Sequence, residues 1–129
     1  MAKLKDLVNV NINRDVIKIQ GVDIPVIFTF KSFPYLEEAY GKPYHIFEKE
    51  LNQMMKKGKV RLGKRETHLM YSLIYAMVRS GGTECTPEEL EGAIPLNDLP
   101  GIFEVILPIF NRQMFQKEDA NKIKSEKKS

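Results

Sequence analysis

The sequence predicts a small α+β protein, in which an N-terminal β-hairpin packs on a bundle of four to five α-helices. Between residues 15 and 30, apolar residues alternate with polar ones at a period of two, which is typical of strands. Over residues 32–41 the period changes, and Phe33, Leu36 and Tyr40 fall on one side of a helix. The segments that follow all have helical spacing. The chain therefore reads as β first and helical afterwards.

The composition fits one folded domain. Of the 129 residues, 43% are hydrophobic and 29% charged, both ordinary for a globular protein. We expect a single domain over residues 1–116, followed by a disordered charged tail over residues 117–129. No apolar run reaches the about 18–20 residues that cross a bilayer, and no secretory signal is visible. With a single cysteine, Cys85, the chain can form no internal disulfide. These features predict a cytoplasmic protein without membrane contact.

The hairpin is predicted from two short alternating runs. Residues 15–20 form the first strand and residues 24–30 the second, with a loop of three or four residues between them. Four apolar side chains of the second strand share one face: Ile24, Val26, Phe28 and Phe30. A lone hairpin is marginal in water, so this face must lie on the helices or join the sheet of another chain.

Helix start and stop signals divide the rest of the chain. We expect helices over residues 43–57 and 64–80, the second with an apolar face wide enough for the centre of the core. A threonine, proline and two glutamates at residues 86–89 form a capping box that begins a short helix. The last helix is expected from about residue 98 to 116, with a kink or break at Pro108.

No residue pattern predicts an enzyme, a metal site or a cofactor. His45 and His68 lie 23 residues apart and match no metal-ligand spacing. Cys85 precedes a helix start, which could lower its pKa, but nothing places a base beside it. The adjacent carboxylates at residues 37–38 and 88–89 point about 100° apart on a helix, so they form no catalytic pair.

The charges are divided between two blocks. Residues 51–79 carry seven Lys and Arg against one acid, a balance of +6, and residues 80–111 carry six acids and no Lys or Arg, a balance of −6. Docking of one block on the other block of a second copy would build a homo-oligomer, whereas the alternative is two independent solvated faces. The candidate self-assembly residues are Lys56, Lys57, Lys59, Arg61, Lys64, Arg65, Glu84, Glu88, Glu89 and Glu91.

The basic segment over residues 56–65 also raises the question of nucleic-acid binding. No aromatic residue interleaves its charges, and no recognisable reader module surrounds it. We therefore do not expect nucleic acid as the main partner.

Three segments carry a resemblance to a known family. They read FTFKSFPYLEEAYG after the hairpin, LIYAMVRSGG in the apolar helix, and TPEELEGAI at the capping box. In this order and spacing, the chain from Ile17 to Gln116 resembles the tail assembly chaperones of long-tailed phages and related prophages of Gram-positive bacteria.

The resemblance implies a non-enzymatic role in virion morphogenesis. Members of that family coat the tape-measure protein, help to recruit tail tube subunits in the host cytoplasm, self-associate and leave the finished tail. They are often encoded with a frameshifted longer form. If apolar surface serves the tape-measure protein, the candidate partner-binding residues are Tyr35, Tyr40, Phe103, Phe110 and Met114. Two alternatives stay open: a small nucleic-acid-binding regulatory protein using residues 56–65, and a structural head–tail or tail component.

Overall fold

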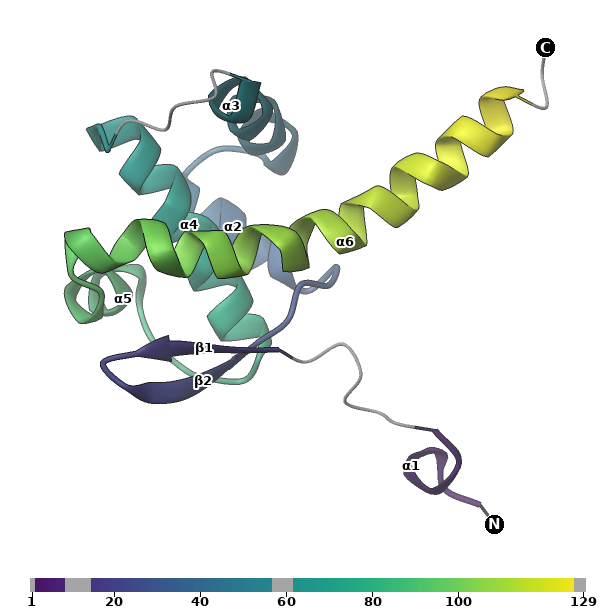
Figure 1. Ribbon diagram of the computed structural model, residues 1–129, viewed down its shortest axis with the longest axis horizontal. Coiled ribbons are helices and arrows are strands. Elements are labelled where there is room, and N and C mark those ends of the chain that lie inside the picture. Colours follow the sequence, from purple (N-terminus) through teal and green to yellow (C-terminus); the bar gives the residue numbers. More distant parts are fainter. Residues whose placement is uncertain (1, 9–14, 57–61, 127–129) are drawn as a thin grey trace.

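The computed structural model describes residues 2–8, 15–56 and 62–126, and side chains as far as Gln113. It confirms the α+β class: a two-stranded antiparallel hairpin precedes the helices of the core (Figure 1). The elements are α1 (Leu4–Leu7), β1 (Asp15–Ile19), β2 (Val22–Val26), α2 (Ser32–Tyr40), α3 (Tyr44–Lys56), α4 (Lys64–Ser80), α5 (Pro87–Ala93), the 3₁₀ turn η1 (Leu96–Asp98) and α6 (Leu99–Glu126).

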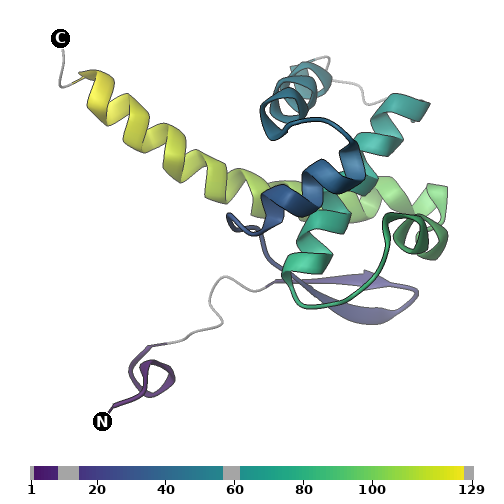
Figure 2. The same cartoon turned by 180° about the vertical axis from the view of Figure 1, so that it is seen from behind.

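Helix α4 is the centre of the core, as its wide apolar face predicts. It contacts α2, α3, α5, α6 and β2, and Figures 1 and 2 both show the other elements arranged around it. Its bounds are those predicted from the sequence. Seven consecutive residues, Ser72–Val78, are buried, so the helix is packed on every side over this stretch. Leu73, Ala76 and Met77 have no exposed surface.

The hairpin turns more tightly than predicted. Gln20 and Gly21 have positive φ angles of 53° and 79°, and Ile19 pairs with Val22 directly across them. The connection therefore has two residues with the backbone twist of a type I′ turn, and the predicted loop of three or four residues is wrong. The non-glycine Gln20 takes the left-handed conformation, while its side-chain Nε2 donates a hydrogen bond to the Ala93 carbonyl at 3.0 Å.

The second strand ends earlier than predicted. β2 stops at Val26, and Phe28 is 4% exposed whereas Phe30 is 83% exposed, so these two rings do not share a core face. The chain turns here because the Thr29 N–H donates to Ser32 Oγ at 2.9 Å, and the Ser32 N–H donates to the Thr29 carbonyl at 2.9 Å. This serine turn leads directly into α2.

The outer edge of β2 is covered by the end of α4. Beyond the strand, the Ile27 N–H donates a hydrogen bond to the Met77 carbonyl at 3.2 Å. Gly81 comes so close to this edge that a Cβ atom there would collide with the Pro25 carbonyl oxygen. Pro25 lacks an N–H and so fits a strand position whose nitrogen faces away from the partner strand. The hairpin is thus attached to the helices through β2.

Helix α5 begins as predicted. Thr86 Oγ1 accepts from the Glu89 N–H at 3.1 Å, and Glu89 Oε1 accepts from the Thr86 N–H at 2.9 Å. These two bonds make the reciprocal capping box. The helix closes at Ala93, and the chain reaches α6 through η1.

Helix α6 is longer than predicted. It passes Pro108 without a break and continues to Glu126, ten residues beyond the predicted end at Gln116. Pro108 is exposed, so the carbonyl group that loses its partner to the proline can bind water. Beyond Asn111 there is no glycine or proline to stop the helix. The division at residue 116 into a domain and a disordered tail stays a prediction.

Candidate interaction surfaces

The predicted partner-binding residues belong largely to the core. Tyr40, Phe103 and Phe110 are 5%, 4% and 3% exposed. Tyr35 is half-buried, with the guanidinium of Arg79 stacked at 4.9 Å from its ring centre. The side chain of Met114 lies outside the described part of the structure. Partner binding by these residues stays a prediction, but Tyr40, Phe103 and Phe110 offer little exposed surface for it.

Phe30, predicted to share one strand face with Phe28, lies on the surface while Phe28 is buried. Phe30 is the most exposed of the large hydrophobic side chains described, and its ring lies edge-on to Phe33 at 5.8 Å. Phe33 in turn lies 4.3 Å from Tyr44, and both are half-buried. The surface between the β2–α2 turn and α3 is therefore aromatic, ending in one exposed ring. The alternation of apolar residues could not predict the exposure of Phe30, because the chain leaves the strand direction in the turn after Phe28.

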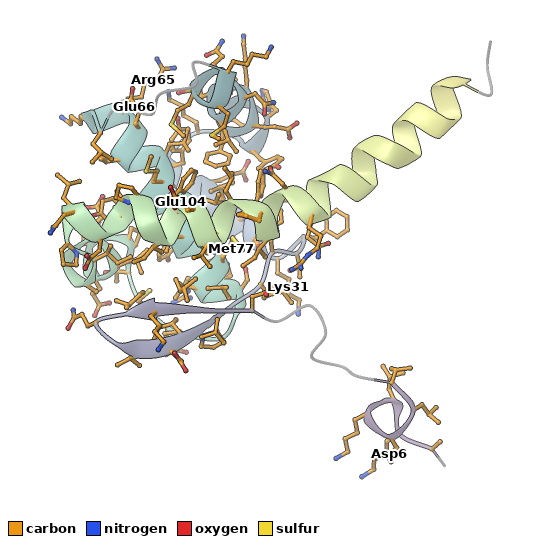
Figure 3. All side chains as sticks on the ribbon, in the orientation of Figure 1. Asp6, Lys31, Arg65, Glu66, Met77 and Glu104 are labelled. Carbon is orange, nitrogen blue, oxygen red and sulfur yellow. The ribbon has the colours of Figure 1, made fainter. Side chains whose placement is uncertain are left out.

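A buried carboxylate joins three parts of the fold. Glu50 is 8% exposed, and its Oε2 accepts from the Tyr40 hydroxyl at 2.7 Å and from Arg65 Nε and Nη2 at 3.1 and 2.9 Å. Its Oε1 accepts from Lys42 Nζ at 2.9 Å. In Figure 3 Arg65 lies at the start of α4, near α3. His68 stacks on the Tyr40 ring at 5.1 Å between centroids and bonds to the Tyr40 carbonyl at 3.0 Å.

The donors around Glu50 hold its charge in place. The hydrogen bond from Tyr40, followed by that from Lys42, lowers the pKa of the Glu50 carboxyl to about 2. The pKa of Tyr40 is raised, first by burial and then by its bond to the Glu50 carboxylate. With both oxygens bonded, Glu50 acts as a tie between α2, α3 and α4. Sequence spacing could not reveal it, since its partners lie 8 to 15 residues away.

The structure describes only some of the charged residues predicted for self-assembly. Lys57, Lys59 and Arg61 lie outside the described residues, and Arg65 is engaged by Glu50. Lys64, Arg65 and Glu91 line the same shallow hollow between α4 and α5, so the two blocks approach each other within one molecule. The other candidates in the described part are exposed: Lys56, Glu84, Glu88 and Glu89. Glu89 also closes the capping box. Their role in self-assembly stays a prediction.

Cys85 is a half-buried free cysteine. Burial raises the pKa of its thiol, and this effect exceeds the opposing one of the nearby Arg79. The suggestion that the helix start lowers this pKa is therefore not supported. Among the described residues no group of three His, Cys, Asp or Glu side chains could hold a metal ion.

A groove of about 560 Å³ runs between β1 and the first half of α6. Val16 and Ile19 line it from the strand, and Ile102 and Val105 line it from the helix. Val16 and Val105 are 52% and 49% exposed, so apolar surface is open to solvent on both walls. Figure 1 shows β1 between β2 and α6. The groove is lined by residues of β1 and α6, so it lies on the side of β1 away from β2.

Comparisons with protein-family models, with curated proteins and with solved structures find no match to this chain.

Within the described ranges no single helix is long and apolar enough to cross a membrane. One pair of segments, Pro87–Ala93 and Leu96–Gln113, together has the length and apolar composition of such a helix, but the two segments are bent by 85° relative to each other. Their apolar residues supply part of the protein core, including Leu90, Leu99 and Ile106.

Proposed function

We propose that this chain is a phage tail assembly chaperone. It binds the tape-measure protein and helps to recruit tail tube subunits, through reversible protein–protein contacts in the cytoplasm of the bacterial host. It is not retained in the mature virion. The observation that carries the proposal is the order of the elements behind the resemblance: hairpin, α2, apolar central helix, capping-box helix and a last apolar helix.

The chemistry of the described surface supports a binding role. The most buried carboxylate, Glu50, has both oxygens occupied by donors from the same chain, which leaves it a structural group. The exposed features are apolar instead: the ring of Phe30 and the groove beside β1. Apolar surface left open to water is typical of sites that meet another protein.

Phe30 is the contact residue that we propose for the tape-measure protein. The hydrogen bonds of Thr29 and Ser32 fix the backbone of the turn that carries this ring, so little backbone freedom is lost when a partner covers it. The half-buried Phe33 and Tyr44 extend the same aromatic surface toward α3. An apolar segment of a long, poorly soluble partner could be covered here.

Co-expression with the tape-measure protein of the same phage genome tests the proposal. We expect the wild-type chain to keep the tape-measure protein soluble and to copurify with it. Phe30→Asp should abolish the complex, while Lys31→Asp, which places the same acid at the neighbouring exposed position, should retain it. A tape-measure protein that stays insoluble with the wild-type chain would refute the function. Equal behaviour of the two variants would refute only the role of Phe30.

The alternative functions have their own measurements. A regulatory nucleic-acid-binding protein should shift DNA or RNA in a gel at physiological salt, and a structural component should be present in purified tails. The described residues give the first alternative little support, since Arg65 is paired with Glu50.

A further inference from the structure

The groove beside β1 borders a strand edge whose backbone groups face outward. In a hairpin closed by a two-residue turn, the pair that flanks the turn exchanges hydrogen bonds, and such pairs then alternate along the strands. Ile19 and Ile17 therefore direct their N–H and C=O groups toward β2. Val16 and Lys18 direct theirs away from it. The bond from Ile27 to Met77, outward from β2, agrees with this alternation.

This outer edge is open in the described structure. Neither Val16 nor Lys18 forms a hydrogen bond to a described residue outside the hairpin. The neighbouring wall is the apolar side of α6 at Ile102 and Val105. A slot with a strand edge on one side and apolar side chains on the other fits one extended chain, which gains hydrogen bonds and apolar contacts together.

The start of the same chain has the sequence that such a slot requires. Residues 8–12 read Val-Asn-Val-Asn-Ile, a strict alternation of apolar and polar side chains. Added antiparallel to β1, with Val10 opposite Ile17, this segment would place its valines and isoleucine on the buried face of the sheet. The same register puts Asn11 and Asn9 opposite Val16 and Lys18, on the solvent face.

The described residues that lead into this segment, helix α1 and Val8, do not line the groove of their own molecule. Helix α1 has no buried residue, and Leu4 and Leu7 are 66% and 69% exposed. Figures 1 and 2 both show α1 apart from the body, near the Asp15 end of the hairpin. Apolar side chains that the described residues leave exposed in this way are available to meet those of another copy.

We propose that residues 8–12 of one copy add as a third strand to the outer edge of β1 in a second copy, where they fill the groove against α6. This exchange joins copies of the chain by main-chain hydrogen bonds and apolar contact. It does not depend on the chaperone function, and it differs from docking of the charge blocks because added salt should leave it largely intact.

Sedimentation velocity on the full-length chain over a concentration series tests the exchange. We expect the wild type to self-associate both at low salt and at 0.5 M salt, roughly equally since apolar and main-chain contacts are weakly screened. Val10→Asp should weaken association by at least about tenfold, because it places a charge on the buried face. Asn11→Asp introduces the same side chain one position along, on the solvent face, and should leave association within about twofold.

A second pair of variants tests the groove that receives the segment. Val105→Asp, in the groove, should weaken association, whereas Asn111→Asp, exposed on α6 outside the groove, should not. Far-ultraviolet circular dichroism checks that both variants keep their helices. A chain that stays monomeric at every concentration overturns the proposal, as do equal effects of Val10→Asp and Asn11→Asp. A monomer destabilised by Val10→Asp would show that the segment binds within its own molecule, which also overturns exchange.

Discussion

Gly81 lies against the carbonyl group of Pro25, with no room between them for even a methyl group. A glycine is needed at position 81 because of this lack of space and not because of the backbone conformation, since Gly81 has an ordinary right-handed φ of −74°. The next residue, Gly82, shows the other use of glycine, because its φ is +107°. One glycine lets the end of α4 approach the hairpin, and the second lets the chain turn away from it.

Gly81→Ala should therefore destabilise the protein by about 1–3 kcal/mol, because the added methyl forces β2 away from α4. Urea unfolding followed by circular dichroism measures the change, at one protein concentration for all variants. Gly92→Ala is the matched control. A Cβ there meets nothing within 4 Å in helix α5, so we expect a gain of about 0.5–1 kcal/mol. Equal stability of the two variants would contradict the close approach.

Replacing Glu50 with Gln should cost about 1–3 kcal/mol at neutral pH, because the Arg65 and Lys42 side chains lose their charged acceptor. Glu104→Gln, at an exposed position on α6, is the control, and we expect a small change from it. The free energy of unfolding in urea is the measurement. A loss no larger than that of the control would mean that Glu50 does not tie the helices together.

The same carboxylate predicts a pH dependence of stability. The pKa of Glu50 is about 2 in the folded protein, below its ordinary value near 4.5. A lowered pKa in the folded state adds stability above the ordinary pKa, and this stability is lost as the pH falls toward 2. The difference in unfolding free energy between wild type and Glu50→Gln should therefore shrink between pH 5 and pH 2. A constant difference over this range would contradict the assignment.

Thr86→Ala removes the side chain that caps α5, and it should destabilise the protein by about 1 kcal/mol. Thr83→Ala, three residues earlier and outside any helix, is the control and should change stability little. Thermal unfolding at neutral pH compares the two. A loss with Thr83→Ala as large as that with Thr86→Ala would show that the capping box is not the cause.

The two rings on either side of the serine turn predict opposite results. Phe28 is buried and lies 4.9 Å from the ring of Phe110, so Phe28→Ala should cost about 3–5 kcal/mol. Phe30→Ala should change the unfolding free energy by less than about 0.5 kcal/mol, because its ring is mostly in water. Urea unfolding separates these outcomes. A large loss with Phe30→Ala would place that ring in the core.

Much of the helical part could be predicted because its signals are local. The spacing of apolar residues in Lys64–Ser80 determines both the helix and its position in the core, and the bounds of α4 match the prediction. The capping box at Thr86 is likewise determined by four adjacent residues. Signals of this kind need no knowledge of distant contacts.

The sequence-based predictions were wrong where contacts between distant residues or unusual backbone angles determine the structure. Gln20 reads as a strand residue, but it takes a left-handed angle in the turn and reaches Ala93, 73 residues away. The alternation that ends at Phe30 continues through a turn made by Thr29 and Ser32. Glu50 reads as one more surface charge of an amphipathic helix. Only the folded chain brings Arg65 and Tyr40 to it.

The hairpin also has a consequence for solubility. An exposed strand edge can pair with the edge of any other chain, and two open edges allow sheets to grow without limit. Here Gly81 and Met77 close the β2 side, so growth of the sheet is confined to the β1 side. One strand added there would occupy the slot between β1 and α6, so α6 would stand where a further strand has to pair. The close approach at Gly81 therefore keeps the β2 edge of this sheet from pairing with another chain.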